Sequence, residues 1–162
     1  MTAIPRLNAA ALVDAGHPDH ARELHALARA ATEVGFFTLC DTPISGTELA
    51  DLIAAYRAFF SQPEPQKAQI DMARTGANRG WGASLSEQVD PAANPDYKEV
   101  FDCGYELPPG DSLSDLAVYA PNLWPASPAG FRPVVQAYYQ KSTAFSLRLL
   151  AAIAKAIAEP AD

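Results

Sequence analysis

The sequence lacks the features of several common classes of protein. No apolar run approaches the ~20 residues that a membrane-spanning helix requires, and the N-terminal residues contain no basic segment followed by an apolar core, as a secretory signal would. The twelve lysines and arginines are scattered and the formal net charge is −7, whereas a general nucleic-acid binder needs clustered positive charge. We therefore expect a cytoplasmic protein that binds neither nucleic acid nor membranes.

Familiar catalytic and phosphate-binding motifs are also absent. The chain has no Gly-x-x-x-x-Gly-Lys-Ser/Thr loop, no Gly-x-Gly-x-x-Gly fingerprint and no Gly-x-Ser-x-Gly elbow. Its two cysteines, Cys40 and Cys103, each lie in an apolar run, which favours buried, reduced thiols over a disulfide or a catalytic nucleophile. No catalytic residue is predicted.

Histidine is confined to the start of the chain, at His17, His20 and His25. His17-Pro18-Asp19 is formally His-x-Asp, two thirds of the facial triad that binds non-haem Fe(II). The third ligand would have to be a distant histidine, and none follows His25. We therefore predict no metal site here and interpret the histidines as surface residues near the start of a helix.

The composition is that of an ordinary globular domain. Hydrophobic residues make up 49% and charged residues 19% of the 162 positions, which is enough chain for one domain with a core. We predict an α+β fold that is mostly helical. Four short strands are expected near Ile4–Leu7, Phe36–Asp41, Gly80–Ser84 and Lys98–Glu106.

Capping signals place two helices in the first part of the chain. Apolar residues recur at helical spacing up to about Val34, and Gly35 fits the stop of that helix. Ser45 and Glu48 have the spacing of a capping box, so the second helix should begin there and end before Pro63.

A third, much longer helix is predicted at the C-terminal end. Ser127 suits an N-cap and Pro128 the first helical position, and helical spacing continues to about Ala158. At 1.5 Å per residue such a helix is ~45 Å long, so it would overhang its own core and pack against something more. Its apolar face contains Phe131, Val134, Val135, Tyr138, Ser142, Phe145, Leu149, Ala152 and Ile153.

Residues 78–108 form the one long segment with strand character. It opens with Arg79-Gly80-Trp81-Gly82, where Arg79 suits either a contact to a small acidic ligand or a structural salt bridge. Farther on, a mostly apolar set alternates with a mostly polar one, as in a strand buried on one face. The set expected to be buried is Tyr97, Glu99, Phe101, Cys103 and Tyr105. The acidic residues, expected chiefly on solvated faces, are Glu87, Asp90, Asp96, Glu99, Asp102 and Glu106.

A family resemblance rests on the order of several short segments. They are Ile4-Pro5-Arg6-Leu7, Glu33-Val34-Gly35-Phe36-Phe37, Phe59-Phe60 before Gln66-Lys67, Asn78-Arg79-Gly80-Trp81, Lys98-Glu99-Val100-Phe101-Asp102 with Gly104 and Glu106, and Asn122-Leu123-Trp124-Pro125 before the long helix. In this order the chain resembles the N-terminal region of 2-oxoglutarate/Fe(II)-dependent dioxygenases of the isopenicillin N synthase type.

The resemblance implies a helix-rich region that wraps the outside of a double-stranded β-helix barrel. The family's iron and 2-oxoglutarate ligands lie in the C-terminal half, so residues 1–162 would be a single N-terminal domain without its catalytic barrel. Alone it should bind neither Fe(II) nor 2-oxoglutarate and should be inactive. In the complete enzyme it would help oxidise a small organic molecule, with Asn78, Arg79, Trp81 and Ser84 near the substrate pocket.

Two other functions remain open from the sequence. The chain could be a non-catalytic module that self-associates, or docks onto a separate barrel chain, through the apolar face of the helix at 127–158. Alternatively, Arg79 and Trp81 could bind a small acidic molecule without any barrel.

Overall fold

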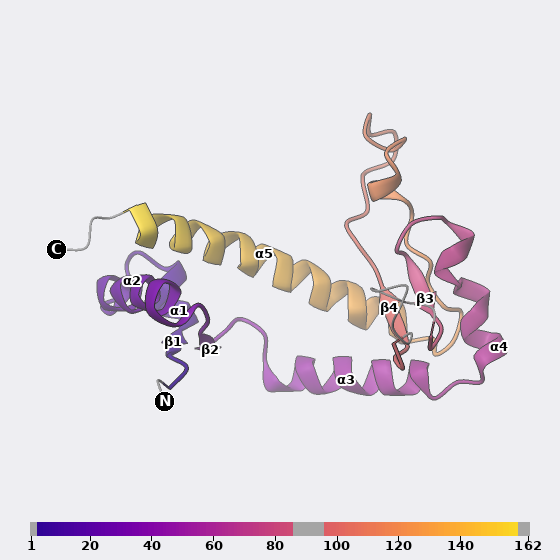
Figure 1. The fold of residues 1–162 in the computed structure, drawn as a ribbon, viewed down its shortest axis with the longest axis horizontal. Helices are drawn as coiled ribbons and strands as arrows, with labels where there is room; N and C mark the ends of the chain where they lie inside the picture. Colours follow the sequence, from indigo (N-terminus) through magenta and orange to yellow (C-terminus); the bar gives the residue numbers. More distant parts are fainter. Residues whose placement is uncertain (1–2, 86–95, 159–162) are drawn as a thin grey trace. The chain divides into compact units, whose positions relative to one another are not determined.

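The computed structural model describes residues 3–85 and 96–158 (Figure 1). Within these ranges the fold is helical with four short strands and no closed barrel, which agrees with the predicted α+β class. Glu87 and Asp90 lie outside the described residues. The elements in chain order are β1 (Arg6–Asn8), α1 (Ala9–Val13), α2 (His20–Arg29), η1 (Ala30–Val34), β2 (Thr38–Cys40), α3 (Gly46–Phe60), α4 (Glu64–Lys67), η2 (Ala68–Ile70), η3 (Met72–Arg74), β3 (Gly80–Gly82), β4 (Val100–Asp102), η4 (Ala117–Tyr119) and α5 (Phe131–Ala158).

The strands form two separate pairs and are shorter than the sequence predicts. β1 and β2 are parallel, with Leu7 opposite Leu39. β3 and β4 are antiparallel, with Trp81 opposite Phe101. Each strand has three residues.

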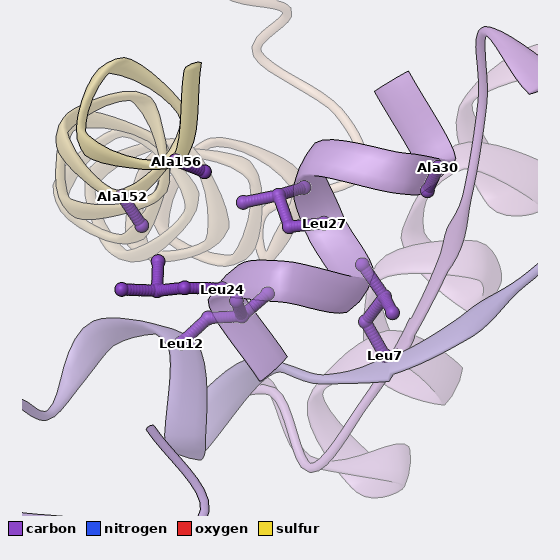
Figure 2. Close-up of a cluster of buried hydrophobic side chains, with 7 residues drawn as sticks. All are labelled: Leu7, Leu12, Leu24, Leu27, Ala30, Ala152 and Ala156. Carbon is purple, nitrogen blue, oxygen red and sulfur yellow. The ribbon is translucent and has the colours of Figure 1, made fainter. Parts of the chain in front are cut away.

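The chain divides into two compact units, and the first comprises residues up to Asp51 and from Gln136 onward. Its core consists of small and medium aliphatic side chains, and Ala152 and Ala156 of α5 face the leucines of α1 and α2 (Figure 2). The small alanines leave room for the leucines, which is how close-packed cores avoid voids. The buried members are Leu7, Leu12, Leu24, Leu27, Ala30, Ala152 and Ala156.

Local signals in this unit behave as predicted. Gly35 has a left-handed φ of 86° and donates its N–H to the Ala30 carbonyl at 2.9 Å, as a glycine that ends a helix commonly does. Glu48 Oε2 accepts the backbone N–H of Ser45 at 2.7 Å, and the hydroxyl of Ser45 accepts the Glu48 N–H at 3.2 Å. The capping box is therefore confirmed. The prediction that Phe36 lies in a buried strand is wrong, because β2 begins at Thr38 and Phe36 is 63% exposed.

Helix α5 confirms the predicted apolar face but not the predicted start. None of its nine predicted face residues is exposed, because 3.6-residue periodicity keeps them on one side of the helix. The helix begins at Phe131 rather than Pro128, whose carbonyl instead accepts the Phe131 N–H at 3.0 Å. Ser127 is therefore not its N-cap.

The second unit, Leu52–Val135, has an aromatic core. The ring of Phe59, fully buried, lies 4.9 Å from that of Phe131 and 5.5 Å from that of Phe101 between ring centroids. Tyr56 and Trp124 extend the cluster through ring contacts to Phe131. Such aromatic pairs stabilise a core beyond their area of burial.

The predicted buried face of residues 97–105 is largely wrong. Phe101 is buried and Cys103 half-buried, but Tyr97 is 84% exposed, and Glu99 and Tyr105 are also exposed. Side chains alternate between the two faces of a strand only within β4, which ends at Asp102. Alternation beyond Asp102 therefore does not predict burial. Among the described residues no helix is long and apolar enough to cross a membrane.

Candidate functional site

The four predicted site residues lie on or beside β3 in the second unit. Trp81 is inside the strand and only 2% exposed, and Arg79, which precedes the strand, is half-buried. Asn78 and Ser84 are exposed on either side of β3. The structure thus brings the four together along one short segment but presents only two of them to solvent.

Trp81 belongs to a polar cluster that contains a buried lysine. Lys67, 5% exposed, places its Nζ 2.5 Å from Glu99 Oε2 and 5.4 Å from the centroid of the Trp81 ring. The same carboxylate oxygen accepts the indole N–H of Trp81 at 3.0 Å. Because Lys67 donates a hydrogen bond to it, the pKa of Glu99 is lowered despite partial burial. Glu99 is therefore a partner of two buried side chains and not simply part of a solvated face.

Lys67 of this cluster is not among the residues predicted from the sequence. Lys67 lies at the end of α4, in a polar segment, and its partner Glu99 is 32 residues away along the chain. No local spacing connects them, and only the fold brings the charges together.

Arg79 binds backbone carbonyls. Its Nη1 donates to the carbonyl of Asn78 at 2.9 Å and its Nη2 to that of Val118 at 2.8 Å. Its Nε is buried and has no hydrogen-bond partner within the described part of the chain. The guanidinium packs so closely on Gly104 that a Cβ at that position would overlap it.

Two further features shape the backbone near Arg79. Asn122 donates to the carbonyl of Gly104 and accepts its N–H, both at 2.8 Å, so one side chain satisfies the strand-like backbone beyond β4. Gly80 has φ of 107° and lies against the Ile70 carbonyl, where no side chain would fit. Burial raises the pKa of the Cys103 thiol, and the charge of Arg79 only partly opposes that rise.

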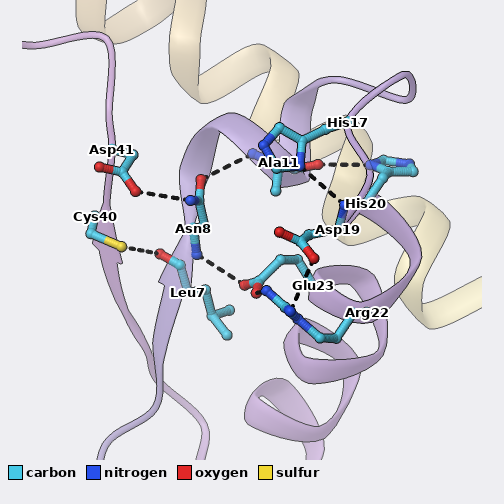
Figure 3. A network of polar contacts seen from close by, with 10 residues as sticks. All are labelled: Leu7, Asn8, Ala11, His17, Asp19, His20, Arg22, Glu23, Cys40 and Asp41. Carbon is cyan, nitrogen blue, oxygen red and sulfur yellow. Dashed lines mark hydrogen bonds and ion pairs between the residues drawn. The ribbon is translucent and has the colours of Figure 1, made fainter.

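Two of the three histidines contact groups of the same chain. His17 Nδ1 accepts the Asp19 N–H at 3.1 Å, and His20 Nδ1 lies 2.8 Å from the Ala11 carbonyl oxygen (Figure 3). Across residues 3–85 and 96–158, no three His, Cys, Asp or Glu side chains gather in a way that could hold a metal ion. These residues therefore do not fit the facial triad of a non-haem iron centre.

The chain is similar in sequence to one group of oxygenases. Residues 4–127 match the family model described as "non-haem dioxygenase in morphine synthesis N-terminal". Among curated relatives, the 2-oxoglutarate-dependent dioxygenase frbJ of Dothideomycetidae sp. (strain 11243) is 33% identical over 132 residues, which is 80% of this chain and 35% of that protein. The 2-oxoglutarate-dependent dioxygenase caaD of Aspergillus niger is 28% identical over 160 residues, 97% of this chain and 49% of that protein.

Solved structures agree with this match. A protein from Caulobacter crescentus, described as of the 2OG-Fe(II) oxygenase family, superposes with a TM-score of 0.73 at 25% identity, over 96% of this chain and 49% of its own. A full-length Neurospora crassa protein in complex with alpha-KG gives a TM-score of 0.77 at 23% identity, over 97% of this chain and 48% of its own; that likeness shows the fold alone. The chain thus spans half or less of the length of these proteins.

Proposed function

Since this chain belongs to the family of N-terminal regions of 2-oxoglutarate-dependent, non-haem iron dioxygenases, we propose that residues 1–162 act as one N-terminal domain of an enzyme that oxidises a small organic molecule with O2. The observation that carries the proposal is the family match over residues 4–127. The reaction itself depends on Fe(II) and 2-oxoglutarate, which supply the oxidising chemistry when bound.

We further propose that this chain alone binds neither group and does not turn over. Iron in such enzymes needs three ligands in an open facial array, and the described residues contain no suitable cluster. Arg79, the cation of the candidate site, already binds two carbonyls. We infer that the iron ligands lie outside residues 3–85 and 96–158.

The contribution of this domain would be to build one side of the substrate pocket. Asn78 and Ser84 are exposed at the two ends of β3, which supports direct contact with a substrate or with the remainder of the enzyme. Arg79 and Trp81 would hold that segment in place through hydrogen bonds to the Val118 carbonyl and to Glu99, respectively. A rigid wall of this kind excludes water and orients a bound molecule.

An anaerobic Fe(II) titration by calorimetry, with and without 2-oxoglutarate, tests the inactive-domain proposal on the 162-residue chain. We expect no saturable heat and no change when His17 is replaced by alanine. Stoichiometric binding that 2-oxoglutarate strengthens, and that His17→Ala abolishes, would refute it. A calcium titration serves as a control for non-specific binding to the acidic surface.

One observation favours a second function, that of an association module. Leu147, Leu150 and Ile157 of α5 are all exposed, although the residues of the predicted apolar face are buried or half-buried. Exposed apolar patches commonly mark interaction surfaces. Sedimentation of the chain over a range of concentrations tests this function: a monomer at every concentration would exclude self-association, and a dimer weakened by Leu150→Glu would support it.

A further inference from the structure

A cavity of about 260 Å³ lies in the first unit, where the parallel strands β1 and β2 end. Its lining comes from α1 and the loop after it, from the loop after β2 and from α5. Ligands of α/β proteins commonly bind outside the carboxyl ends of parallel strands. We propose that this cavity binds a small primary amine as its ammonium ion, a role that does not depend on the proposed dioxygenase function.

Two carboxylates in the lining carry the proposal. Asp41 Oδ2 accepts the side-chain amide of Asn8 at 2.8 Å (Figure 3), and Asp14 Oδ1 accepts the N–H of Gly16 at 2.9 Å. Each carboxylate is thus held through one oxygen. The second oxygen of each has no hydrogen bond within the described residues and is available to an ammonium donor.

Asp41 also has an unusual backbone conformation, with φ of 53°. Among residues with a side chain, aspartate and asparagine adopt this left-handed region most readily. The left-handed backbone at Asp41 sets the direction of its carboxylate at the end of β2, and the Asn8 amide donates a hydrogen bond to that carboxylate. Asp41 is exposed, and its hydrogen bond to Asn8 restrains the carboxylate at the edge of the cavity, which reduces the entropy lost on binding.

The other lining residues define the rest of the ligand. Ala9, Ala10, Val13, Pro43 and Phe145 provide an apolar surface, so the amine should carry an apolar body. The volume is just below the ~300–1,000 Å³ of sites for drug-sized molecules, which suits a small one.

The remaining polar groups in the lining are largely committed to partners within the protein. His17 accepts the Asp19 N–H at 3.1 Å, and Thr42 donates to the Ile44 carbonyl at 3.3 Å. Among the described lining residues Arg148 is the one lysine or arginine, and its Nη2 donates to the Val13 carbonyl at 2.9 Å. With two carboxylates against one guanidinium, the lining retains a net negative charge, which favours a cation over an anion.

The first test needs no variant. Benzylamine, benzyl alcohol and benzoate share one apolar ring and differ in charge, and each is titrated at neutral pH into the ¹⁵N-labelled chain. We expect saturable shifts of the Asp14, Asp41 and Thr42 amides with benzylamine. Benzyl alcohol and benzoate should bind up to about fivefold more weakly, which corresponds to the upper end of the range for an exposed ion pair. Equal binding of all three, or no saturable shift, would overturn the proposal.

Variants then identify which charged side chains determine benzylamine binding. Asp41→Asn keeps the left-handed backbone and an acceptor for Asn8, and Asp14→Asn keeps an acceptor for Gly16, so both should preserve the fold while weakening benzylamine binding. Arg148→Gln should strengthen binding, because it removes the repelling cation. Asp115→Asn, on an exposed loop of the second unit, is the matched control and should change nothing. Unchanged affinity in both Asp14→Asn and Asp41→Asn, with dispersed spectra, would contradict the proposal.

Discussion

Removing Glu99 should destabilise the second unit more than removing its partner Lys67. In Glu99→Ala the ammonium of Lys67, 5% exposed, loses the carboxylate 2.5 Å away and keeps only the Phe60 carbonyl at 3.3 Å and the Trp81 ring. In Lys67→Met the carboxylate of Glu99 keeps the Trp81 N–H and, because its side chain is 33% exposed, can be hydrated. The two halves of one ion pair are therefore not equivalent.

The magnitude follows from this asymmetry. Breaking a fully buried pair by removing one partner costs about 3–5 kcal/mol, and water access on the Glu99 side reduces this to about 2–3 kcal/mol. Lys67→Met should cost less than ~1 kcal/mol, because the Glu99 carboxylate that remains is 33% exposed and can be hydrated, and partly exposed ion pairs contribute about 0–1 kcal/mol. For a chain of this size, ~1 kcal/mol corresponds to roughly 2–4 °C in Tm, so Glu99→Ala should lower Tm by roughly 4–12 °C.

Thermal unfolding followed by circular dichroism, with tryptophan fluorescence as a second probe, measures both variants. Glu64→Ala, an exposed acid in α4, is the matched control and should change stability by less than about 0.5 kcal/mol. The double variant Lys67→Met/Glu99→Ala should be more stable than Glu99→Ala, because the unpaired buried charge is gone. If Lys67→Met is as damaging as Glu99→Ala, or the double variant is the least stable, the argument from buried charge is wrong.

The pH dependence of the same pair has a defined sign. The pKa of Glu99 is lowered in the folded protein by the hydrogen bond from Lys67. Its stabilising contribution is therefore complete above the pKa of the unfolded carboxyl and is lost as pH falls through the lower folded value. The difference in Tm between the native chain and Glu99→Ala should shrink on acidification, and a difference that stays constant would contradict this assignment.

Three further predictions concern other parts of the fold. Phe59→Ala should cost about 3–5 kcal/mol, because the ring is fully buried among aromatic neighbours; chemical denaturation measures it, and a cost below ~1 kcal/mol would show that this core is not close-packed. Gly80→Ala should cost about 1–3 kcal/mol or more, because φ is 107° and the Ile70 carbonyl occupies the Cβ position; an unchanged Tm would contradict the geometry of β3. The pKa of Glu48 is lowered to about 2, chiefly by the hydrogen bond from Lys141. The Tm difference between the native chain and Glu48→Gln should therefore be complete above the ordinary carboxyl pKa of 4.5 and be lost as pH falls to about 2. Thermal scans from pH 7 to 2 test this sign, and a difference that grows on acidification would refute it.

The features predicted correctly from the sequence are those fixed by neighbours along the chain. Gly35 stops its helix, Ser45 and Glu48 form their capping box, and α5 presents the predicted apolar face. Each of these depends on groups within one or two helical turns, because caps bind residues two or three positions away and helical periodicity repeats every 3.6 residues. The order of the short segments likewise indicated the dioxygenase family without any contact information.

The errors arose where a local pattern needed a long-range partner to have meaning. Tyr97 and Tyr105 continue an alternating pattern, but β4 pairs over only three residues, and both side chains are exposed. Phe36 extends an apolar run, yet β2 begins two residues later and leaves the ring exposed. Apolar alternation predicts burial only as far as strand pairing persists.

The candidate site shows the same division. From the sequence, Arg79 and Trp81 stood out because cationic and aromatic residues are set among glycines. Their roles were decided by the fold: Val118, 39 residues from Arg79, and Glu99, 18 residues from Trp81, supply the acceptors. Hydrogen bonds between groups so far apart exist only after the backbone has brought them together. The sequence by itself therefore determined the helix stop at Gly35, the capping box at Ser45 and Glu48, the apolar face of α5 and the family. Only the tertiary structure decided where α5 begins and which charges are buried and paired.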